Sequence, residues 1–336
     1  MPPVELIKKA IRSPAKVPQY SLNKSLSILK SGWLETYRRS LLISSQKELI
    51  HKFTNQDEFA LVILDACRYD EFGKIYDNYL SGELQKVWAS GRWTAEYVER
   101  TWTDNHDLTY INTAPVISNR YFEDIGSSYR PEEHISNLVN IWESHWEPDL
   151  ETVPAEAVTA VALDEIRNKP TRLVAHYMQP HVPYIGEVRL DEVDCTKLEI
   201  ESAASQGLDA DTILDYENRS TYDLLEMLEK EKISNEELMN AYESNLEYVF
   251  ESVVQLVRRL DCPVVITADH GEHLGEEEKY LHEEDSTLIR QVPWLTVSED
   301  ETGTQSDQPF NYEGNVEPVT DVSKDIEDRL ESLGYK

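Results

Sequence analysis

Residues 58–70 have the sequence EFALVILDACRYD. Within this stretch, residues 59–64 form a continuous apolar run that ends in the carboxylate of Asp65. A short run without polar alternation is typical of a strand buried on both faces, as in the middle of a parallel sheet. Apolar side chains then recur at helical spacing over residues 68–80. The stretch therefore predicts a buried strand followed by a helix.

The same alternation continues along the chain. Further strands are predicted at residues 84–89, 108–112, 172–177, 263–268 and 292–297, and helices at about 155–167, 221–231, 235–260 and 320–333. The helix at 235–260 has the clearest pattern, because Ser234 and Glu237 form a capping box ahead of one apolar face. Strands that alternate with helices predict an α/β fold, with a mostly parallel central sheet flanked by helices on both faces.

Charge divides the 336 residues into two parts. Residues 1–52 contain ten basic and three acidic residues, net +7, whereas residues 53–336 contain 22 basic and 61 acidic residues, net −39. We therefore expect a basic N-terminal arm, residues 1–52, and a catalytic domain, residues 53–336. A body this acidic repels phosphate backbones, which disfavours a nucleic-acid partner. It also indicates a halophilic source, because salt screens the repulsion between carboxylates; an acidic mesophile protein is the alternative.

The basic arm intersperses apolar residues, including Trp33 and Leu34, among its lysines and arginines. Helical spacing with basic flanks predicts that the arm lies on an anionic surface. That surface is either a lipid membrane or the protein's own acidic body. No apolar run reaches the ~18 residues that a spanning helix needs. Since the N-terminus also lacks the apolar core of a signal peptide, a cytoplasmic protein is predicted, with peripheral membrane contact through residues 1–52 as one option.

Two predicted strands end in carboxylates. Asp65 follows the first, and Asp269 and His270 follow the strand at 263–268, within the sequence TADHGE of residues 267–272. Two carboxylates and an imidazole suit a divalent cation such as Mn²⁺, Zn²⁺ or Mg²⁺. Taken alone, Asp65 is better explained as a helix N-cap, and the DHG sequence as a turn with a surface histidine. Their occurrence at the ends of two separate strands favours a metal site.

A third group of polar residues follows the strand at 172–177, in the sequence HYMQPHVPY of residues 176–184. His181 lies in the loop, where functional residues concentrate. For His176, at the strand end, a buried histidine satisfied by the backbone is the stronger interpretation. His282, twelve residues after His270, is a further candidate ligand or anion binder.

The order of these motifs resembles the alkaline phosphatase superfamily, in its sulfatase-like and phosphoglycerol-transferase-like branch. The similarity covers about residues 58–297, rests mainly on the TADHGE sequence, and together with the charge suggests a halophilic archaeon. It implies one or two divalent cations (Mn, Zn, Mg or Ca) held by Asp65, Asp269 and His270. It further implies that His181 acts on the substrate anion and that His282 contacts the substrate or a second metal.

By the same resemblance, the nucleophile should follow the second strand. Thr94 opens a predicted helix there, and the helix N-terminus would support a bound phosphate or sulfate. A simple N-cap role for Thr94 is the alternative, and Ser90 is the second candidate nucleophile. Arg68 and Arg92 are expected to bind the substrate. Glu272 and His273 are expected to orient His270.

The chain departs from typical sulfatases, because it lacks their Cys-x-Pro-Ser-Arg motif, and Cys67 lies beside the first metal ligand instead. A threonine nucleophile suits phosphoester cleavage or phosphoryl transfer better than formylglycine chemistry. We therefore expect a metal-dependent phosphoester hydrolase or transferase acting on an anionic ester, either a small molecule or one linked to a glycan or lipid. The alternatives are a sulfate-ester hydrolase and a non-catalytic member of the fold that binds glycans or lipids.

Overall fold

The structure is a computed structural model that describes residues 32–147, 149–167, 169–190, 224, 227–228, 232–282, 284–306, 308–310 and 312. Residues 1–31 of the basic arm and the helix predicted at 320–333 lie outside the described residues. Of the helix predicted at 221–231, only residues 224, 227 and 228 are described, and these three are helical.

An eight-stranded sheet in the order β1-β3-β10-β7-β2-β6-β4-β5 forms the centre of the fold. Its strands are β1 (Ser44–Ser45), β2 (Phe59–Asp65), β3 (Gly82–Trp88), β4 (His106–Asn112), β5 (Ile135–Asn140), β6 (Arg172–Pro180), β7 (Val264–Ala268) and β10 (Gln291–Val297). β10 runs antiparallel to β3 and β7, whereas the other neighbours pair in parallel. The predicted α/β fold with a mostly parallel sheet is confirmed.

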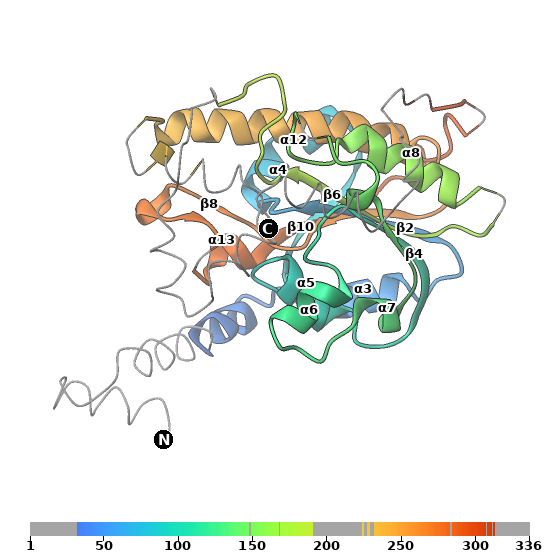
Figure 1. Cartoon of the computed structure of the whole chain (residues 1–336), viewed down its shortest axis with the longest axis horizontal. Helices are drawn as coiled ribbons and strands as arrows, with labels where there is room; N and C mark the ends of the chain where they lie inside the picture. Colours follow the sequence, from blue (N-terminus) through green and yellow to red (C-terminus); the bar gives the residue numbers. More distant parts are fainter. Residues whose placement is uncertain are drawn as a thin grey trace.

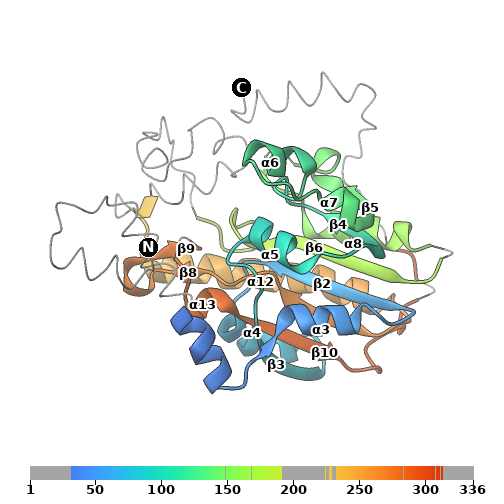
Figure 2. The same cartoon turned by 90° about the horizontal axis from the view of Figure 1, so that it is seen from below.

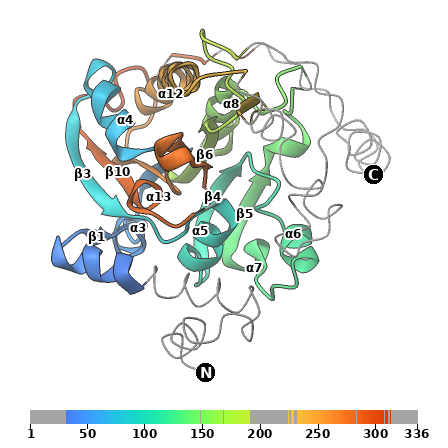
Figure 3. The same cartoon turned by 90° about the vertical axis from the view of Figure 1, so that its left-hand side faces the viewer.

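Helices cover both faces of this sheet (Figures 1 and 3). One layer contains α4 (Tyr69–Ile75), α8 (Ala155–Glu165) and α12 (Asn235–Val257). The other contains α3 (Gln46–Phe53), α5 (Thr94–Thr101), α6 (Asn119–Asp124) and α7 (Pro131–His134). Figure 2 looks onto this second layer, with α3 and α5 in front of the sheet. None of the helices in the described ranges is both long and apolar enough to cross a membrane.

The core lies where the sheet meets these layers. All seven residues of β2 are buried, which explains the unbroken apolar run from Phe59 to Leu64. Above the sheet, α12 buries an apolar face that includes Val249 and Val253. Burial of each large apolar side chain contributes about 1.5–3 kcal/mol, so this packing fixes β2 firmly in the middle of the sheet.

The last part of the basic arm packs against this body. β1 pairs in parallel with β3, and Gln46 and Ile50 of α3 are fully buried. The Gln46 amide donates to Thr267 Oγ1 (3.0 Å) and to the Ala268 carbonyl O at the end of β7. Residues 44–53 therefore support the strand that leads into the DHG sequence.

The carboxyl ends of the parallel strands meet at one edge of the sheet, which faces the viewer in Figure 3. β2 pairs in parallel with β7, and Leu64 lies opposite Ala268 in this register. The next residues, Asp65 and Asp269, are consequently neighbours. After Asp269 the chain forms a small hairpin, β8 (His273–Leu274) with β9 (Tyr280–Leu281), and the short helix α13 (Thr287–Arg290) before it enters β10.

Candidate active site

Asp65, Asp269 and His270 converge at the carboxyl edge of β2 and β7. His270 Nε2 lies 3.5 Å from Asp65 Oδ1 and 3.4 Å from Asp269 Oδ2. All three side chains are buried, and one ligand atom from each lies within 4.8 Å of the others. The predicted metal ligands are thus brought together, and we call them the first cluster.

The hydrogen bonds of the first cluster leave lone pairs that could bind a cation. His270 Nδ1 lies 2.9 Å from the Gly271 carbonyl O, which can only accept a hydrogen bond, so Nδ1 carries the ring proton. Its Nε2 therefore turns a lone pair toward the two carboxylates. Among the described residues, none bonds to His270 Nε2, Asp65 Oδ1 or Asp269 Oδ2. Three buried acceptors that face one another are unfavourable unless a cation lies between them.

Titration behaviour and spacing agree with this arrangement. Burial, and next the charge of Asp269, raise the pKa of Asp65, and burial lowers the pKa of His270. Ligands held about 2.1 Å from a tetrahedral Zn²⁺ are about 3.4 Å apart, close to the observed separations. The residues of the first cluster therefore fit a divalent cation.

Thr94 lies beside the first cluster. It is the first residue of α5, and its Oγ1 donates to Asp65 Oδ2 over 3.3 Å. The N-cap position belongs to Trp93, so Thr94 does not have the capping role considered as its alternative.

Gly91 makes the placement of Thr94 possible, because a Cβ at Gly91 would lie 2.2 Å from the backbone N of Tyr97. Ser90 Oγ instead contacts Thr101 Oγ1 (2.6 Å), at the other end of α5.

A second group, which we call the second cluster, is formed by His181, Glu272 and His282. His181 Nε2 lies 3.9 Å from Glu272 Oε1, and both carboxylate oxygens of Glu272 are buried without a partner among the described residues. Burial raises the pKa of Glu272 to about 7. The His282 ring lies 4.9 Å from that of His270 and 6.0 Å from that of His181, so the two clusters adjoin.

This geometry corrects the roles expected for Glu272 and His273. The His270 ring is oriented by the Gly271 carbonyl O, not by either residue. Glu272 faces His181, and His273 Nε2 bonds to Ser286 Oγ (2.9 Å). The sequence did not reveal the place of Glu272, because it depends on how the segment after β7 folds back over the sheet.

The two arginines have different surroundings. The buried Arg68 guanidinium pairs with Asp70 (2.6 Å) and with Glu276, so it joins the turn after β2 to the segment after β8. Arg68 was expected to bind the substrate, but these two carboxylates neutralise its positive charge. Arg92 is half-exposed and pairs with Glu96 (3.0 Å). It is also close enough to His282 to help lower the pKa of that histidine, after burial and the two neighbouring imidazoles.

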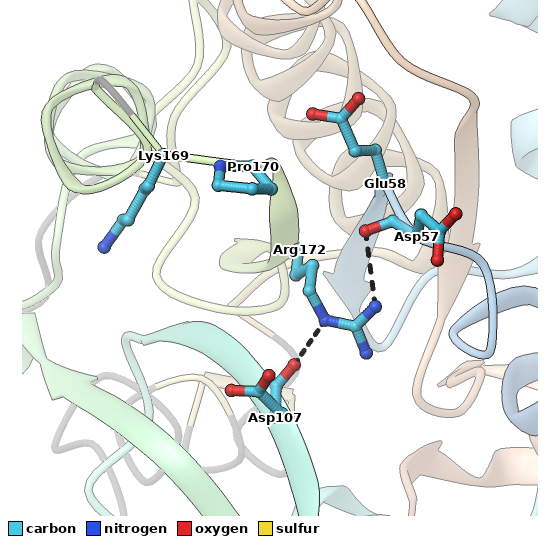
Figure 4. Close-up of a pocket in the computed structure, with 6 residues that line it drawn as sticks. All are labelled: Asp57, Glu58, Asp107, Lys169, Pro170 and Arg172. Atoms are coloured by element: carbon cyan, nitrogen blue, oxygen red, sulfur yellow. Dashed lines mark hydrogen bonds between the residues drawn. The ribbon is translucent and has the colours of Figure 1, made fainter.

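A surface cavity of about 760 Å³ lies at the opposite edge of the sheet (Figure 4). It is lined by residues that precede or open β2, β4 and β6, among them Asp57, Asp107 and Arg172. Arg172 donates to backbone carbonyls of Asp107 (2.6 Å) and Asp57 (3.3 Å), which ties these strand starts together. Ligands of open α/β sheets bind at the carboxyl ends of the strands, so this cavity is not the candidate site.

The chain was compared with known proteins to find its family. Among solved structures, the soluble domain of lipooligosaccharide phosphoethanolamine transferase A from Neisseria meningitidis has 15% identity and a TM-score of 0.46, covering 72% of this chain and 76% of that one. The periplasmic domain of phosphoethanolamine transferase EptC from Campylobacter jejuni has 14% identity and a TM-score of 0.44, covering 73% and 80%. The periplasmic domain of EptC from Escherichia coli, in complex with Zn, has 14% identity and a TM-score of 0.41, covering 83% and 82%.

Likenesses at this level carry no argument about activity. No curated protein matched the chain. The model of the sulfatase family matches residues 94–311, which is more than half of the chain. The chain therefore belongs to the sulfatase family.

Proposed function

We propose that this protein is a metal-dependent enzyme that cleaves or transfers phosphoesters through Thr94. Membership of the sulfatase family supports action on sulfate or phosphate esters. The observation that carries the proposal is the 3.3 Å contact between Thr94 Oγ1 and Asp65 Oδ2, next to the unpartnered ligand atoms of the first cluster. A hydroxyl in this position is a natural nucleophile.

Asp65, Asp269 and His270 would hold the cation, which when bound supplies Lewis-acid polarisation of the ester and of the attacking hydroxyl. The hydrogen bond from Thr94 to Asp65 Oδ2 fixes the hydroxyl and offers an acceptor for its proton. As its proton passes to Asp65, Oγ1 attacks phosphorus and the bond from phosphorus to the ester oxygen breaks. That oxygen takes a proton from water and leaves as the alcohol. Water, in a hydrolase, or a second hydroxyl, in a transferase, subsequently takes the phosphoryl group from Thr94.

Other groups at the same edge would stabilise negative charge on the substrate. The first backbone N–H groups of α5 have no helical acceptor and point out of the helix at Thr94. His181 and His282 of the second cluster, with Arg92 nearby, are suited to bind the anionic ester oxygens. A substrate with an exposed anionic ester fits this set, whether it is a small molecule or linked to a glycan or lipid.

Metal analysis combined with turnover tests the proposal. Purified protein in molar KCl is analysed for bound metal and assayed with an aryl phosphate, an aryl phosphodiester and an aryl sulfate. We expect bound divalent metal, turnover of a phosphoester, and its loss in Thr94→Ala. Ser90→Ala is the matched control and should keep parental turnover, since its hydroxyl bonds to Thr101.

The rival functions give different results. Turnover of the sulfate ester alone would favour a sulfate-ester hydrolase, although Thr94 cannot become formylglycine. Bound metal with no turnover of any of the three esters would favour a non-catalytic binding protein. Parental turnover by Thr94→Ala would exclude Thr94 as the nucleophile.

A further inference from the structure

His176 lies directly behind the two carboxylates of the first cluster. It belongs to β6 and is fully buried, opposite Ile63 in the parallel register with β2. Its Nε2 lies 4.0 Å from Asp65 Oδ2 and 3.9 Å from Asp269 Oδ2. No group among the described residues hydrogen-bonds to this nitrogen. The ring therefore faces both carboxylates from the interior of the sheet.

The opposite side of the ring is held by Tyr110. His176 Nδ1 lies 2.8 Å from the hydroxyl of this tyrosine, which is on β4 and fully buried. The His176 backbone is fixed as well, because Thr113 Oγ1 donates to its carbonyl O over 2.9 Å. The imidazole consequently bridges Tyr110 and the first cluster, and its rotation is restrained at both ends.

The proton positions follow from this bridge. If the Tyr110 hydroxyl donates to Nδ1, the ring proton is on Nε2 and points between Asp65 and Asp269. If Nδ1 donates to the tyrosine instead, the Nε2 lone pair faces two carboxylates, which is electrostatically unfavourable. The first arrangement is therefore favoured, with an N–H dipole directed at both anions over a distance longer than a hydrogen bond.

We infer that His176 is a positioning residue that, held by Tyr110, orients Asp65 and Asp269 toward the cation and toward Thr94. Asp65 Oδ2 receives the Thr94 hydroxyl on one side and faces His176 Nε2 on the other. The N–H dipole offsets the repulsion between the two carboxylates before any cation binds, in addition to the backbone N–H groups of Ala66 and His270 that hold Asp269 Oδ1. This inference rests on the proposed metal site, and partners of this kind typically change metal affinity about 10–100-fold when they are removed.

Metal affinity, measured by competition with a chelator, tests the inference together with the melting temperature of the metal-free protein. We expect His176→Phe to weaken metal binding about 10–100-fold. The melting temperature of its metal-free form should fall modestly, because no N–H dipole then offsets the repulsion between the two carboxylates. His176→Gln, which retains an N–H donor, should recover part of the loss. Tyr110→Phe should weaken binding less than His176→Phe, because the ring remains while its proton position is no longer fixed.

Tyr177→Phe is the matched control. Tyr177 follows His176 on β6 and is equally buried, but its hydroxyl bonds to Thr159 (2.9 Å). We expect its metal affinity to equal that of the parent. Parental affinity in His176→Phe would overturn the inference. If His176→Phe does not fold, the metal affinity of Tyr110→Phe tests the inference instead. An affinity equal to that of the parent in Tyr110→Phe would also overturn the inference. A parent protein that binds no divalent metal would instead refute the proposed function itself.

Discussion

At the scale of single residues, the site collects groups that are unfavourable by themselves. Asp65 and Asp269 bring two carboxylates together in a buried space, an arrangement that lowers stability while no cation is bound. The turn between the strand and the next helix adds strain, because Ala66 has a φ of +56°. A left-handed conformation costs a residue with a Cβ roughly 1–2 kcal/mol. Hydrogen bonds from Ala66 N to Asp269 Oδ1 and from Tyr242 to Ala66 O hold this turn.

Asp269→Asn should separate metal binding from folding. Its Oδ1 accepts from Ala66 N and His270 N, and an asparagine retains this acceptor. The new amide NH2 then replaces Oδ2 and donates toward Asp65 and His270, the two acceptors that repel Oδ2 in the parent protein. We therefore expect the melting temperature of the metal-free protein to stay equal or rise, and its increase on metal addition to disappear.

Differential scanning calorimetry with and without metal measures both quantities. Asp164→Asn on the exposed surface of α8 is the control and should behave as the parent. If the metal content of Asp269→Asn equals that of the parent, the cation site is wrongly placed.

At the scale of elements, the close approach of α13 to the segment after β7 shapes the site. A Cβ at Gly271 would lie 2.1 Å from the Leu288 carbonyl O, and the Gly271 N–H donates to the Ile289 carbonyl O over 2.8 Å. The glycine of the DHG sequence is therefore required by contact with α13. This contact brings the segment after His270 back over the sheet.

Gly271→Ala should consequently destabilise the protein and disturb the clusters. Forced displacement of packed backbone costs typically about 1–3 kcal/mol. We expect a lower melting temperature and weaker metal binding. Gly73→Ala is the control, because its Cβ would meet nothing closer than Leu84 Cδ2 at 3.8 Å on an exposed helix position. That change should stabilise α4 by about 0.5–1 kcal/mol. Equal melting temperatures for the two variants would contradict this account.

Elements with strong local patterns could be predicted from the sequence, and those specified by distant contacts could not. β2 matches its apolar run, and α12 begins after Ser234, whose capping box is present. β5 was not predicted, because half of its six residues are polar and only Ile135 is fully buried. The antiparallel direction of β10 was not predicted either, since it results from the return of the chain through α13. The strand-end carboxylates were identifiable, whereas the Arg68–Glu276 pair connects residues 208 positions apart.

At the scale of the whole molecule, the charge distribution is the dominant feature. Residues 53–336 carry a net charge of −39, and repulsion on this scale destabilises a compact state unless it is screened. At 0.1 M salt the Debye length is ~10 Å, long enough for neighbouring surface carboxylates to repel. A halophilic source stays a prediction that this charge supports.

Stability should therefore depend on salt. We expect the melting temperature to rise markedly between low and molar KCl, because screening removes repulsion from the folded state more than from the expanded one. Sucrose at an equal change in water activity controls for a general solute effect. A melting temperature that stays constant across this range of KCl would contradict the halophilic interpretation.

The basic arm gives the last prediction. Its residues 44–53 join the body through β1 and the buried Ile50, whereas Trp33, Leu41 and Leu42 are 60%, 55% and 89% exposed. The two alternatives for this arm are that it binds a lipid membrane or that it packs on the acidic body of the protein. At molar salt the screening length falls to ~3 Å, so attraction between basic residues and anionic lipid largely vanishes and apolar insertion would have to dominate.

Two truncations and a surface variant distinguish these accounts. We expect deletion of residues 1–52 to lower the melting temperature strongly, because it removes α3, and we expect no sedimentation of the full chain with phosphatidylglycerol liposomes in molar KCl. Deletion of residues 1–31 alone measures how much these residues contribute to the melting temperature. The opposite result is liposome binding by the full chain that is lost in a Trp33→Ser, Leu42→Ser variant of unchanged melting temperature. With Val188→Ser as the control for an exposed apolar residue elsewhere, that result would establish a membrane-binding arm, since only the lipid account requires these side chains to leave water.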